Sequence, residues 1–363
     1  MRLFTFLLGT LFFAFHLLFY KRVLKRVRLP LSVTRLLTLL IWGNYLMVLL
    51  YLLARYGWEP PRFLYYLSSL SIGIGFLLFL GWLLYETVTW LHRLFPSPRL
   101  KHRVDLLFMT GFAVLTLLAI YGGAQPPLLK KITIDQHRFN RPYRIVQISD
   151  MHIGGLVDRE FVERCVSRIN ALHPDLVVIT GDLVDARIEK IRHSLAPLAR
   201  LQSRFGLFYV PGNHEYFHGI DTILAYLPKL GMTVLENRAV KIDNAFWVMG
   251  VDDLMGLRRG RHRPDIEKAY RDRKDGAPVL LLAHQPRFIK KLANHHPALM
   301  LCGHTHGGQV WPFQYLVARF QPFVKSLHVI GKNRHIYVNS GIGFWGPPMR
   351  LGSRAEIAVI EWR

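Results

Sequence analysis

The first third of the chain is organised by long, uninterrupted apolar runs. Four of them hold 16 to 22 residues each without any Asp, Glu, Lys or Arg, and they cover residues 3–20, 36–54, 64–85 and 106–121. A helix needs roughly 17–25 apolar residues to cross a bilayer. One such run could be a buried core helix, but four runs separated by basic loops favour membrane spans. We therefore predict a four-helix transmembrane domain over residues 1–122.

The basic residues around these runs predict their orientation. The two loops that follow the first and third runs carry ten Lys and Arg residues, whereas the opposite side carries five. By the positive-inside rule the two basic loops lie in the cytoplasm, and an even number of spans places both termini outside. We expect the C-terminal domain to face the periplasm or the cell exterior.

After residue 122 the pattern changes, and we expect a linker over 123–141. Beyond it, apolar runs of strand length alternate with helical periodicity, as in the helices predicted at 159–173 and around 187–204. Later, predicted strands follow one another with fewer helices between them. The main strand-like runs are "YRIVQIS" (143–149), "LVVIT" (176–180), "LFYV" (207–210), "PVLLLA" (278–283), "ALMLC" (298–302), "HIYVN" (335–339) and "EIAVIEW" (356–362). This order predicts an α/β protein with two sheets and helices outside them.

The formal net charge of +23 does not indicate a nucleic-acid-binding protein. Residues 1–122 carry 13 Lys and Arg against 3 Asp and Glu, a juxtamembrane excess that suits anionic lipid. The remaining chain has a moderate excess, 34 against 21, and no nucleic-acid-recognition motif. Cys165 and Cys302 both stand in apolar surroundings, which favours core packing over a disulfide or metal pair.

Groups able to bind metal stand just after five of the predicted strands. Carboxyl ends of strands are where α/β sheets gather ligand groups. Each residue alone could be a turn residue, a helix N-cap or a core histidine. Their recurrence at five strand ends favours one shared metal site. The residues are Asp150 and His152, Asp182 and Asp185, Asn213 and His214, His284, and finally His304 and His306.

His304 and His306 lie one residue apart in "LMLCGHTHGGQVWPF" (299–313). Alternate residues of an extended segment share a face, so a pair that reaches two separate points needs a kinked turn. The neighbouring glycines permit such a turn. A solvated loop is the alternative interpretation of this stretch taken alone.

The ordered motifs "SDMH", "GDLVD", "GNHE", "AHQP" and "GHTHGG" resemble those of the calcineurin-like metallophosphoesterases. The closing "GFWGPPMRLGSRAEI" (343–357) is similar to the bacterial membrane-associated YkuE/YaeI-like phosphodiesterases. The resemblance covers residues 142–363 and leaves out the helical part. It implies a four-layer α/β/β/α sandwich in the C-terminal domain. The four apolar runs, and not the resemblance, predict a multi-pass protein of the bacterial inner (cell) membrane.

The resemblance also implies a site with two divalent metal ions. One ion would be held by Asp150, His152 and His306, the other by Asn213, His284 and His304, with Asp182 bridging them. Ligands without thiolate suit Mn, Fe or Zn. His214 would protonate or stabilise the leaving oxygen, with Asp185 orienting it. Substrate contacts are expected from Arg350, as a phosphate ligand, and from Trp311 and Trp345, as an apolar rim.

The expected function is that of a membrane-anchored phosphodiesterase, in which a hydroxide bridging two metal ions attacks a phosphate ester, lipid-linked or lipid-derived. Its expected partners are the bilayer and an amphiphilic substrate, with no nucleic acid. One alternative is a pyrophosphatase of the UDP-diacylglucosamine type in lipid A synthesis, which would need the opposite topology. A second is a non-catalytic membrane receptor or scaffold with a vestigial site, against which the intact ligand set counts.

Overall fold

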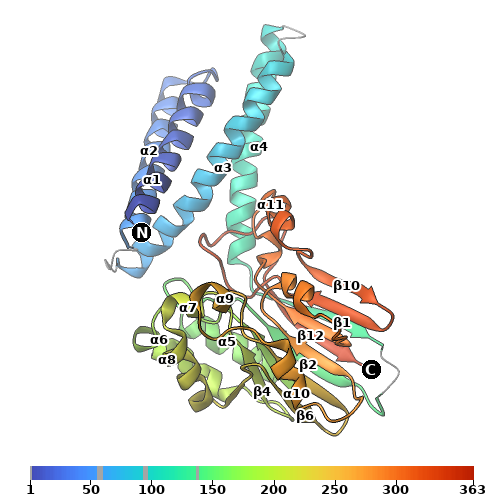
Figure 1. Cartoon of the computed structure of the whole chain (residues 1–363). Helices are drawn as coiled ribbons and strands as arrows, with labels where there is room; N and C mark the ends of the chain where they lie inside the picture. The colour runs from blue at the N-terminus through green and yellow to red at the C-terminus, as the bar shows by residue number, and fades with distance from the viewer. Residues whose placement is uncertain (1, 55–59, 93–96, 136–138) are drawn as a thin grey trace. The chain divides into compact units, whose positions relative to one another are not determined.

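The computed structural model describes residues 2–54, 60–92, 97–135 and 139–363. It divides into two compact units, of which the first holds residues 1–124 and 346–349 and the second holds residues 125–345 and 350–363. Figure 1 shows the long helices of the first unit and the strands of the second. Each unit has its own core, so each is described by itself.

The first unit contains four helices long and apolar enough to cross a membrane, within the described residues. They are α1 (Arg2–Phe19), α2 (Leu31–Ala54), α3 (Arg62–His92) and α4 (Pro98–Ala124), and a π-helical turn at Tyr20–Leu24 follows α1. Helices satisfy every backbone hydrogen bond within one segment, as the interior of a bilayer requires. The last three are longer than the apolar runs because they continue into flanking polar residues.

Small residues on α3 form the buried centre of the helical unit. A Cβ atom on Gly75 would lie 2.7 Å from the ring of Phe12 on α1, so glycine allows α1 and α3 to approach closely. Asn44 on α2 donates to the carbonyl oxygen of Ser71 on α3 at 3.1 Å. Close contacts and interhelical hydrogen bonds of this kind hold the helices together.

The second unit contains two mixed sheets. The first sheet has the strand order β1 (Leu128–Ile134), β12 (Glu356–Trp362), β2 (Tyr143–Ile148), β3 (Leu176–Thr180), β4 (Leu207–Val210) and β5 (Met232–Val234). The second sheet has the order β10 (Ser326–Gly331), β11 (Arg334–Val338), β9 (Leu299–Cys302), β8 (Val279–Leu282), β7 (Phe246–Gly250) and β6 (Arg238–Ile242). β2 to β5 pair in parallel, as do β7, β8 and β9.

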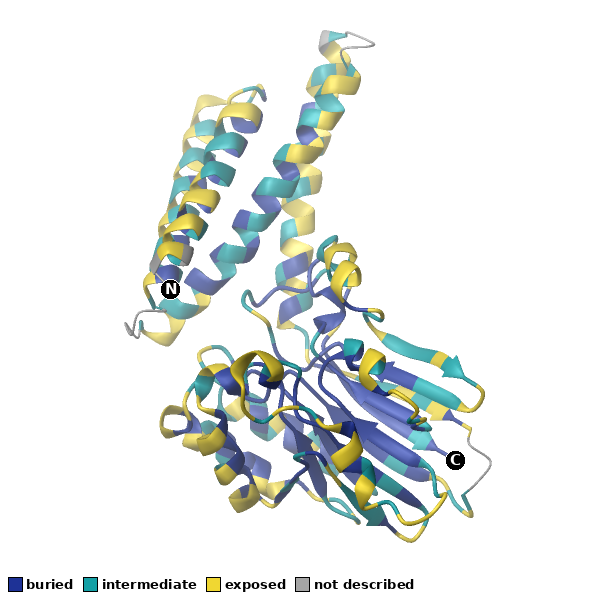
Figure 2. Ribbon diagram, in the orientation of Figure 1, coloured by how far each residue is buried: buried dark blue, intermediate teal, exposed yellow. Residues whose placement is uncertain are grey.

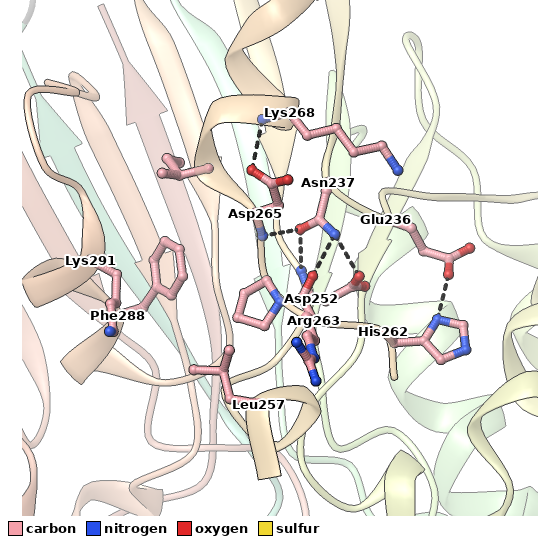
Figure 3. A pocket seen from close by; sticks show the side chains of 12 residues that line it. Glu236, Asn237, Asp252, Leu257, His262, Arg263, Asp265, Lys268, Phe288 and Lys291 are labelled. Atoms are coloured by element: carbon pink, nitrogen blue, oxygen red, sulfur yellow. Dashed lines mark hydrogen bonds and ion pairs between the residues drawn. The ribbon is translucent and has the colours of Figure 1, made fainter. Parts of the chain in front are cut away.

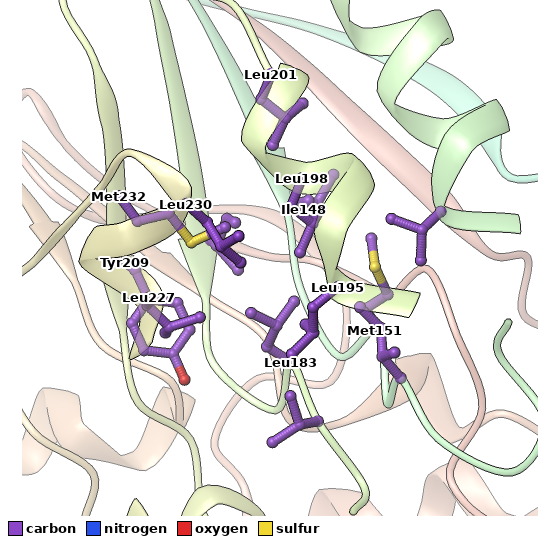
Figure 4. Packing of buried hydrophobic residues seen from close by; sticks show 14 of the residues in the cluster. Ile148, Met151, Leu183, Leu195, Leu198, Leu201, Tyr209, Leu227, Leu230 and Met232 are labelled. Carbon is purple, nitrogen blue, oxygen red and sulfur yellow. The ribbon is translucent and has the colours of Figure 1, made fainter. Parts of the chain in front are cut away.

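Alternate side chains of these strands enter different cores, because neighbours on a strand point to opposite faces. On β3, Leu176 and Val178 belong to the core between the sheets, whereas Val177 and Ile179 pack under the outer helices. Figure 4 shows the outer core, in which Leu195 and Leu198 lie among the buried side chains. Figure 2 shows the sheets as the most continuously buried part of this unit.

Helices cover the outer faces of both sheets, so the expected α/β/β/α architecture is confirmed. The first sheet carries α5 (Arg159–Asn170), α6 (Ile188–Leu195), α7 (Glu215–His218) and α8 (Ile220–Tyr226). The remaining helices are α9 (Met255–Arg259), α10 (Ile266–Arg271) and α11 (Phe313–Phe320). Short 3₁₀ turns lie at Ala196–Arg200, Leu227–Leu230, Pro286–Lys291 and His306–Gly308.

Two details differ from the sequence-based expectation. The segment expected to be a linker contains β1, which pairs in parallel with β12. The strand was not predicted because Lys130 and Lys131 interrupt its apolar pattern. Lysines are nevertheless common on edge strands, where they discourage pairing with other chains. The helix expected around 187–204 ends at Leu195, because Pro197 cannot continue an α-helix.

Candidate active site

The carboxyl ends of five strands bring all seven expected metal ligands together. Asp150 and His152 follow β2, Asp182 follows β3, Asn213 follows β4, His284 follows β8, and His304 and His306 follow β9. All except His304 are at most 9% exposed, and His304 is partly buried. The prediction that these residues share one site agrees with the fold, because β2, β3 and β4 are neighbours in one sheet and β8 and β9 in the other.

The backbone at this site is unusual. Five of the seven residues have left-handed φ angles, between 48° and 73°: Asp150, His152, Asp182, His304 and His306. Such angles are uncommon outside glycine and cluster at functional sites, where the surrounding structure holds them in place. The strand-end turns therefore aim these side chains at the cost of local strain.

Glycines let the ligand loops approach one another. A Cβ atom on Gly303 would lie 2.2 Å from Oδ2 of Asp150, and one on Gly212 would lie 2.2 Å from Oδ1 of Asp182. Gly307 and Gly308, after His306, have positive φ angles of 61° and 80°. The turn is thus kinked at His304 and His306, which have left-handed φ angles themselves, and it continues through these two glycines.

The first ligand group consists of Asp150, His152 and His306. Nε2 of His152 lies 3.1 Å from Nε2 of His306, which lies 3.6 Å from Oδ1 of Asp150. Nδ1 of His152 donates to Asp185 at 2.9 Å, which leaves the lone pair on Nε2 facing the group.

The second group consists of Asn213, His284 and His304, with Asp182 between the two groups. Nε2 of His284 lies 3.2 Å from Oδ2 of Asp182, 3.2 Å from Oδ1 of Asn213 and 3.2 Å from Nδ1 of His304. Nδ1 of His284 must donate to its partner, the carbonyl oxygen of Thr180 at 2.8 Å, so Nε2 presents a lone pair. Oδ2 of Asp182 is also 3.9 Å from Nε2 of His152 in the first group.

This donor set fits divalent metal ions. Oδ2 of Asp182 and Oδ1 of Asn213 each lie 3.2 Å from Nε2 of His284, so a proton or a metal ion among them is needed to offset the repulsion of their lone pairs. Separations of this size are those expected between ligands placed about 2.0–2.2 Å from one ion. Imidazole, carboxylate and amide donors without thiolate suit Mn, Fe or Zn.

His214 and Asp185 form a hydrogen-bonded pair beside these ligands. Oδ1 of Asp185 accepts from Nδ1 of His214 at 2.5 Å, and the main-chain N–H of His214 donates to Oδ1 of Asp182 at 2.8 Å. Burial lowers the pKa of His214, but the Asp182 and Asp185 carboxylates outweigh it and raise this pKa to about 9. In the protein without bound metal ions, these charges therefore favour a protonated His214 at the edge of the site.

Glu215 was not expected to be part of this site. It is fully buried, and its carboxylate accepts main-chain N–H groups of Asp182 at 3.1 Å, Leu183 at 2.8 Å and Gly212 at 2.7 Å. It therefore ties the loop after β3 to the loop after β4. The only sequence signal was its place in "GNHE", where an acid in the first turn of a helix has an ordinary explanation.

The three expected substrate contacts have different positions. Arg350 is 1% exposed and donates to the main-chain oxygens of Ser340 at 3.0 Å and Gly343 at 2.8 Å. Both terminal nitrogens of the guanidinium donate to main-chain oxygens and the side chain is buried, so we do not retain Arg350 as a phosphate ligand. Trp345 lines a cavity of about 260 Å³ beside the metal ligands, whereas Trp311 is half exposed and does not line it.

A separate pocket of about 640 Å³ lies near α10 (Figure 3). Its His262 is held between the carboxylates of Glu236, at 2.8 Å, and Asp221, at 2.7 Å. Both ring nitrogens are thus engaged, so His262 lacks the free lone pair of a metal ligand. Burial and the nearby Glu236 raise the pKa of Asp252, which also lines this pocket, to about 7.

Comparison with known proteins decides the family. Residues 143–308 match the protein family described as calcineurin-like phosphoesterase. A Helicobacter pylori protein named as an uncharacterized metallophosphoesterase is 37% identical over 309 residues, which cover 83% of each chain. This chain belongs to the calcineurin-like metallophosphoesterases. The metallophosphoesterase resemblance drawn from its motifs is confirmed, and the chain is a metal-dependent phosphoester hydrolase.

Other relatives of this metallophosphoesterase include membrane proteins and a YkuE protein. A Danio rerio protein named as a transmembrane protein with metallophosphoesterase domain is 30% identical over 387 residues, which cover 98% of this chain and 86% of the relative. The Bacillus subtilis metallophosphoesterase YkuE is 31% identical over 241 residues, 63% of this chain and 82% of the relative. The similarity to the first protein extends over the helical unit, which the motifs alone did not reach. The metallophosphoesterase is thus a membrane protein.

Proposed function

We propose that this metallophosphoesterase is a membrane-anchored phosphodiesterase with two divalent metal ions. The observation that carries the proposal is the convergence of seven nitrogen and oxygen ligands beside the His214–Asp185 pair. When bound, two such ions would lower the pKa of a water nucleophile and neutralise charge on the phosphoryl oxygens. The individual roles of the ligands follow the assignment made from the motifs.

The proton transfer is the task of His214. Its Nδ1 is bound to Asp185, so its Nε2, 3.9 Å from Oδ2 of Asp182, is the nitrogen that faces the site. We assign to this nitrogen the donation of a proton to the leaving oxygen. Asp185 holds the ring in place and stabilises its positive charge, as carboxylates do for catalytic histidines.

The charge of the cavity favours a diester. Besides metal ligands and His214, the described residues that line it are apolar or uncharged, and none is Lys or Arg. A phosphodiester carries a single negative charge, which the metal ions alone can neutralise. A nucleotide-linked pyrophosphate carries more charge and would call for additional cationic groups. The pyrophosphatase alternative therefore has less support than the diesterase.

A substrate comparison tests this proposal. The full-length chain in lipid nanodiscs, supplied with Mn²⁺, would be given bis(4-nitrophenyl) phosphate, 4-nitrophenyl phosphate and a UDP-sugar at equal concentrations. We expect the highest kcat/KM for the diester. A preference for the UDP-sugar would contradict the proposal, and no hydrolysis by the fully metallated chain would favour the receptor or scaffold alternative.

For localisation we propose the bacterial inner membrane, with the catalytic domain in the periplasm. The support is the excess of basic residues in the two loops expected to be cytoplasmic. Both native cysteines are buried, so single cysteines at exposed positions can report the topology. In intact cells, a membrane-impermeant maleimide should label the Lys274→Cys protein and spare the Arg28→Cys protein. The reverse result would overturn the orientation and strengthen the pyrophosphatase alternative.

A further inference from the structure

One side of α11 faces a cavity that is also lined by four of the seven expected metal ligands. Four apolar residues with the spacing i, i+3, i+4 and i+7 form this side, and they line the cavity together with Asp182, His214 and Trp345. The polar and apolar parts thus belong to one continuous space of about 260 Å³. The four residues are Phe313, Leu316, Val317 and Phe320.

These side chains are not part of the core. No residue of α11 is buried, and Leu316 and Phe320 are 53% and 66% exposed. Trp345, which is 51% exposed, lies with its ring centroid 5.9 Å from that of Phe313. Large apolar groups exposed together beside a reaction centre are typical of a binding surface, because water contact costs them free energy.

The aromatic residue beside α11 is held in place. The main-chain N–H of Trp345 donates to Oε1 of Gln309 at 2.9 Å, and Nε2 of Gln309 donates to the Trp345 oxygen at 3.1 Å. Gln309 in turn follows the turn that carries His306. The main chain of Trp345 is therefore anchored to the turn that carries His306, which keeps its ring beside Phe313 and the cavity.

We propose that the α11–Trp345 surface binds the alkyl or acyl chain of an amphiphilic phosphodiester whose phosphate lies at the metal ligands. This inference rests on the proposed function and names the class of its substrate. The four α11 side chains offer no hydrogen-bonding group, which favours a hydrocarbon chain over a nucleobase or sugar. The membrane-spanning helices keep the enzyme where such amphiphiles are concentrated.

The test is a series of alkyl 4-nitrophenyl phosphates from methyl to octyl, hydrolysed by the full-length chain in nanodiscs with Mn²⁺. For the unmodified protein, kcat/KM should rise about twofold per methylene, below the roughly fourfold limit for full burial. The rise should level off near the length of the α11 face, about 10 Å. Leu316→Ser and Phe320→Ser should each lower the octyl-to-methyl ratio of kcat/KM by about tenfold or more.

Tyr315→Ser is the matched control, because Tyr315 is 67% exposed on α11 but does not line the cavity. It should keep the ratio of the unmodified protein. A binding readout comes from an alkyl phosphate brominated on its chain, which should quench tryptophan fluorescence in the unmodified protein and much less in the Trp345→Phe protein.

The outcomes separate this inference from the proposed function. Hydrolysis of the methyl ester without any dependence on chain length would overturn the chain site and leave the phosphodiesterase intact. A chain-length dependence that survives both Leu316→Ser and Phe320→Ser would also overturn it. A higher kcat/KM for thymidine 4-nitrophenyl phosphate than for the octyl ester would also overturn it, because it would show that the surface binds a stacked nucleobase and not an alkyl chain. No hydrolysis of any ester by the metallated protein would contradict both proposals.

Discussion

Glu215→Gln tests whether a buried carboxylate holds the ligand loops together. Oε1 of Glu215 accepts from the N–H of Leu183, and Oε2 accepts from those of Asp182 and Gly212. An amide has one acceptor oxygen and one NH₂ group. Whichever way it turns, its NH₂ group faces main-chain N–H groups that have lost their acceptor, in a region without access to water.

The size of the effect follows from these contacts. Each buried donor left without a partner costs about 1–3 kcal/mol, and the substitution removes a buried charge, which offsets part of the loss. We expect Glu215→Gln to lower the free energy of unfolding by about 3 kcal/mol. For a domain of this size that lowers the melting temperature by roughly 6–12 °C. The loop that carries Asp182 is also released, so metal affinity should fall about 10- to 100-fold.

The assay is thermal melting of the full-length chain in detergent, followed by tryptophan fluorescence with and without a chelator, together with metal analysis. Glu163→Gln is the control, because Glu163 is a partly exposed carboxylate that binds Arg159 at 3.0 Å and Arg200 at 3.1 Å. Its loss should cost less than about 1 kcal/mol. A Glu215→Gln protein that melts and binds metal like the Glu163→Gln protein would refute the role assigned to Glu215.

Two further predictions concern single residues. His214→Ala should keep near-normal metal content and lower kcat by about 10²- to 10⁴-fold, with the largest loss for substrates that have poor leaving groups. If the His214→Ala protein bound no metal, His214 would instead support the metal ligands. Asp252→Asn should stabilise the protein at neutral and alkaline pH. The pKa of Asp252 is raised to about 7 in the folded protein. The wild-type protein therefore loses stability as pH rises from about 4 to 7, because the buried carboxyl becomes charged. The melting-temperature advantage of Asp252→Asn should therefore grow over that range, with an upper bound of about 4 kcal/mol, and an advantage that is equal at pH 4 and pH 8 would refute this reasoning.

The candidate ligand set could be predicted from the sequence because the relevant signals are local. An expected metal ligand stands shortly after five of the apolar strands, so the strand pattern and the motifs together placed Asp150, Asp182 and His284 at the carboxyl ends of strands, two in the first sheet and one in the second. Long apolar runs likewise marked the membrane helices, whose length the bilayer dictates. In these cases neighbouring residues contain all the information that the inference needs.

Other features depend on distant parts of the chain and were missed or misjudged. Arg350 looked like a phosphate ligand, but its guanidinium is buried by segments that only the fold brings around it. Glu215 acquires its role from a loop more than thirty residues earlier in the sequence. The α11 surface joins a helix after β9 to Trp345, and neither segment alone predicts the cavity between them. The aromatic residues had indicated an apolar rim without showing which of them form it.

The most direct test of a dinuclear metal centre is a titration of the chelator-stripped, full-length chain with Mn²⁺, in which bound metal and hydrolysis of bis(4-nitrophenyl) phosphate are measured together. The ligand set predicts no hydrolysis in the stripped protein and full activity at two ions per chain. Asp182 lies between the two ligand groups, so Asp182→Asn should weaken metal binding at both sites. Wild-type hydrolysis by the metal-free protein, or two tightly bound ions with normal turnover in Asp182→Asn, would contradict this account.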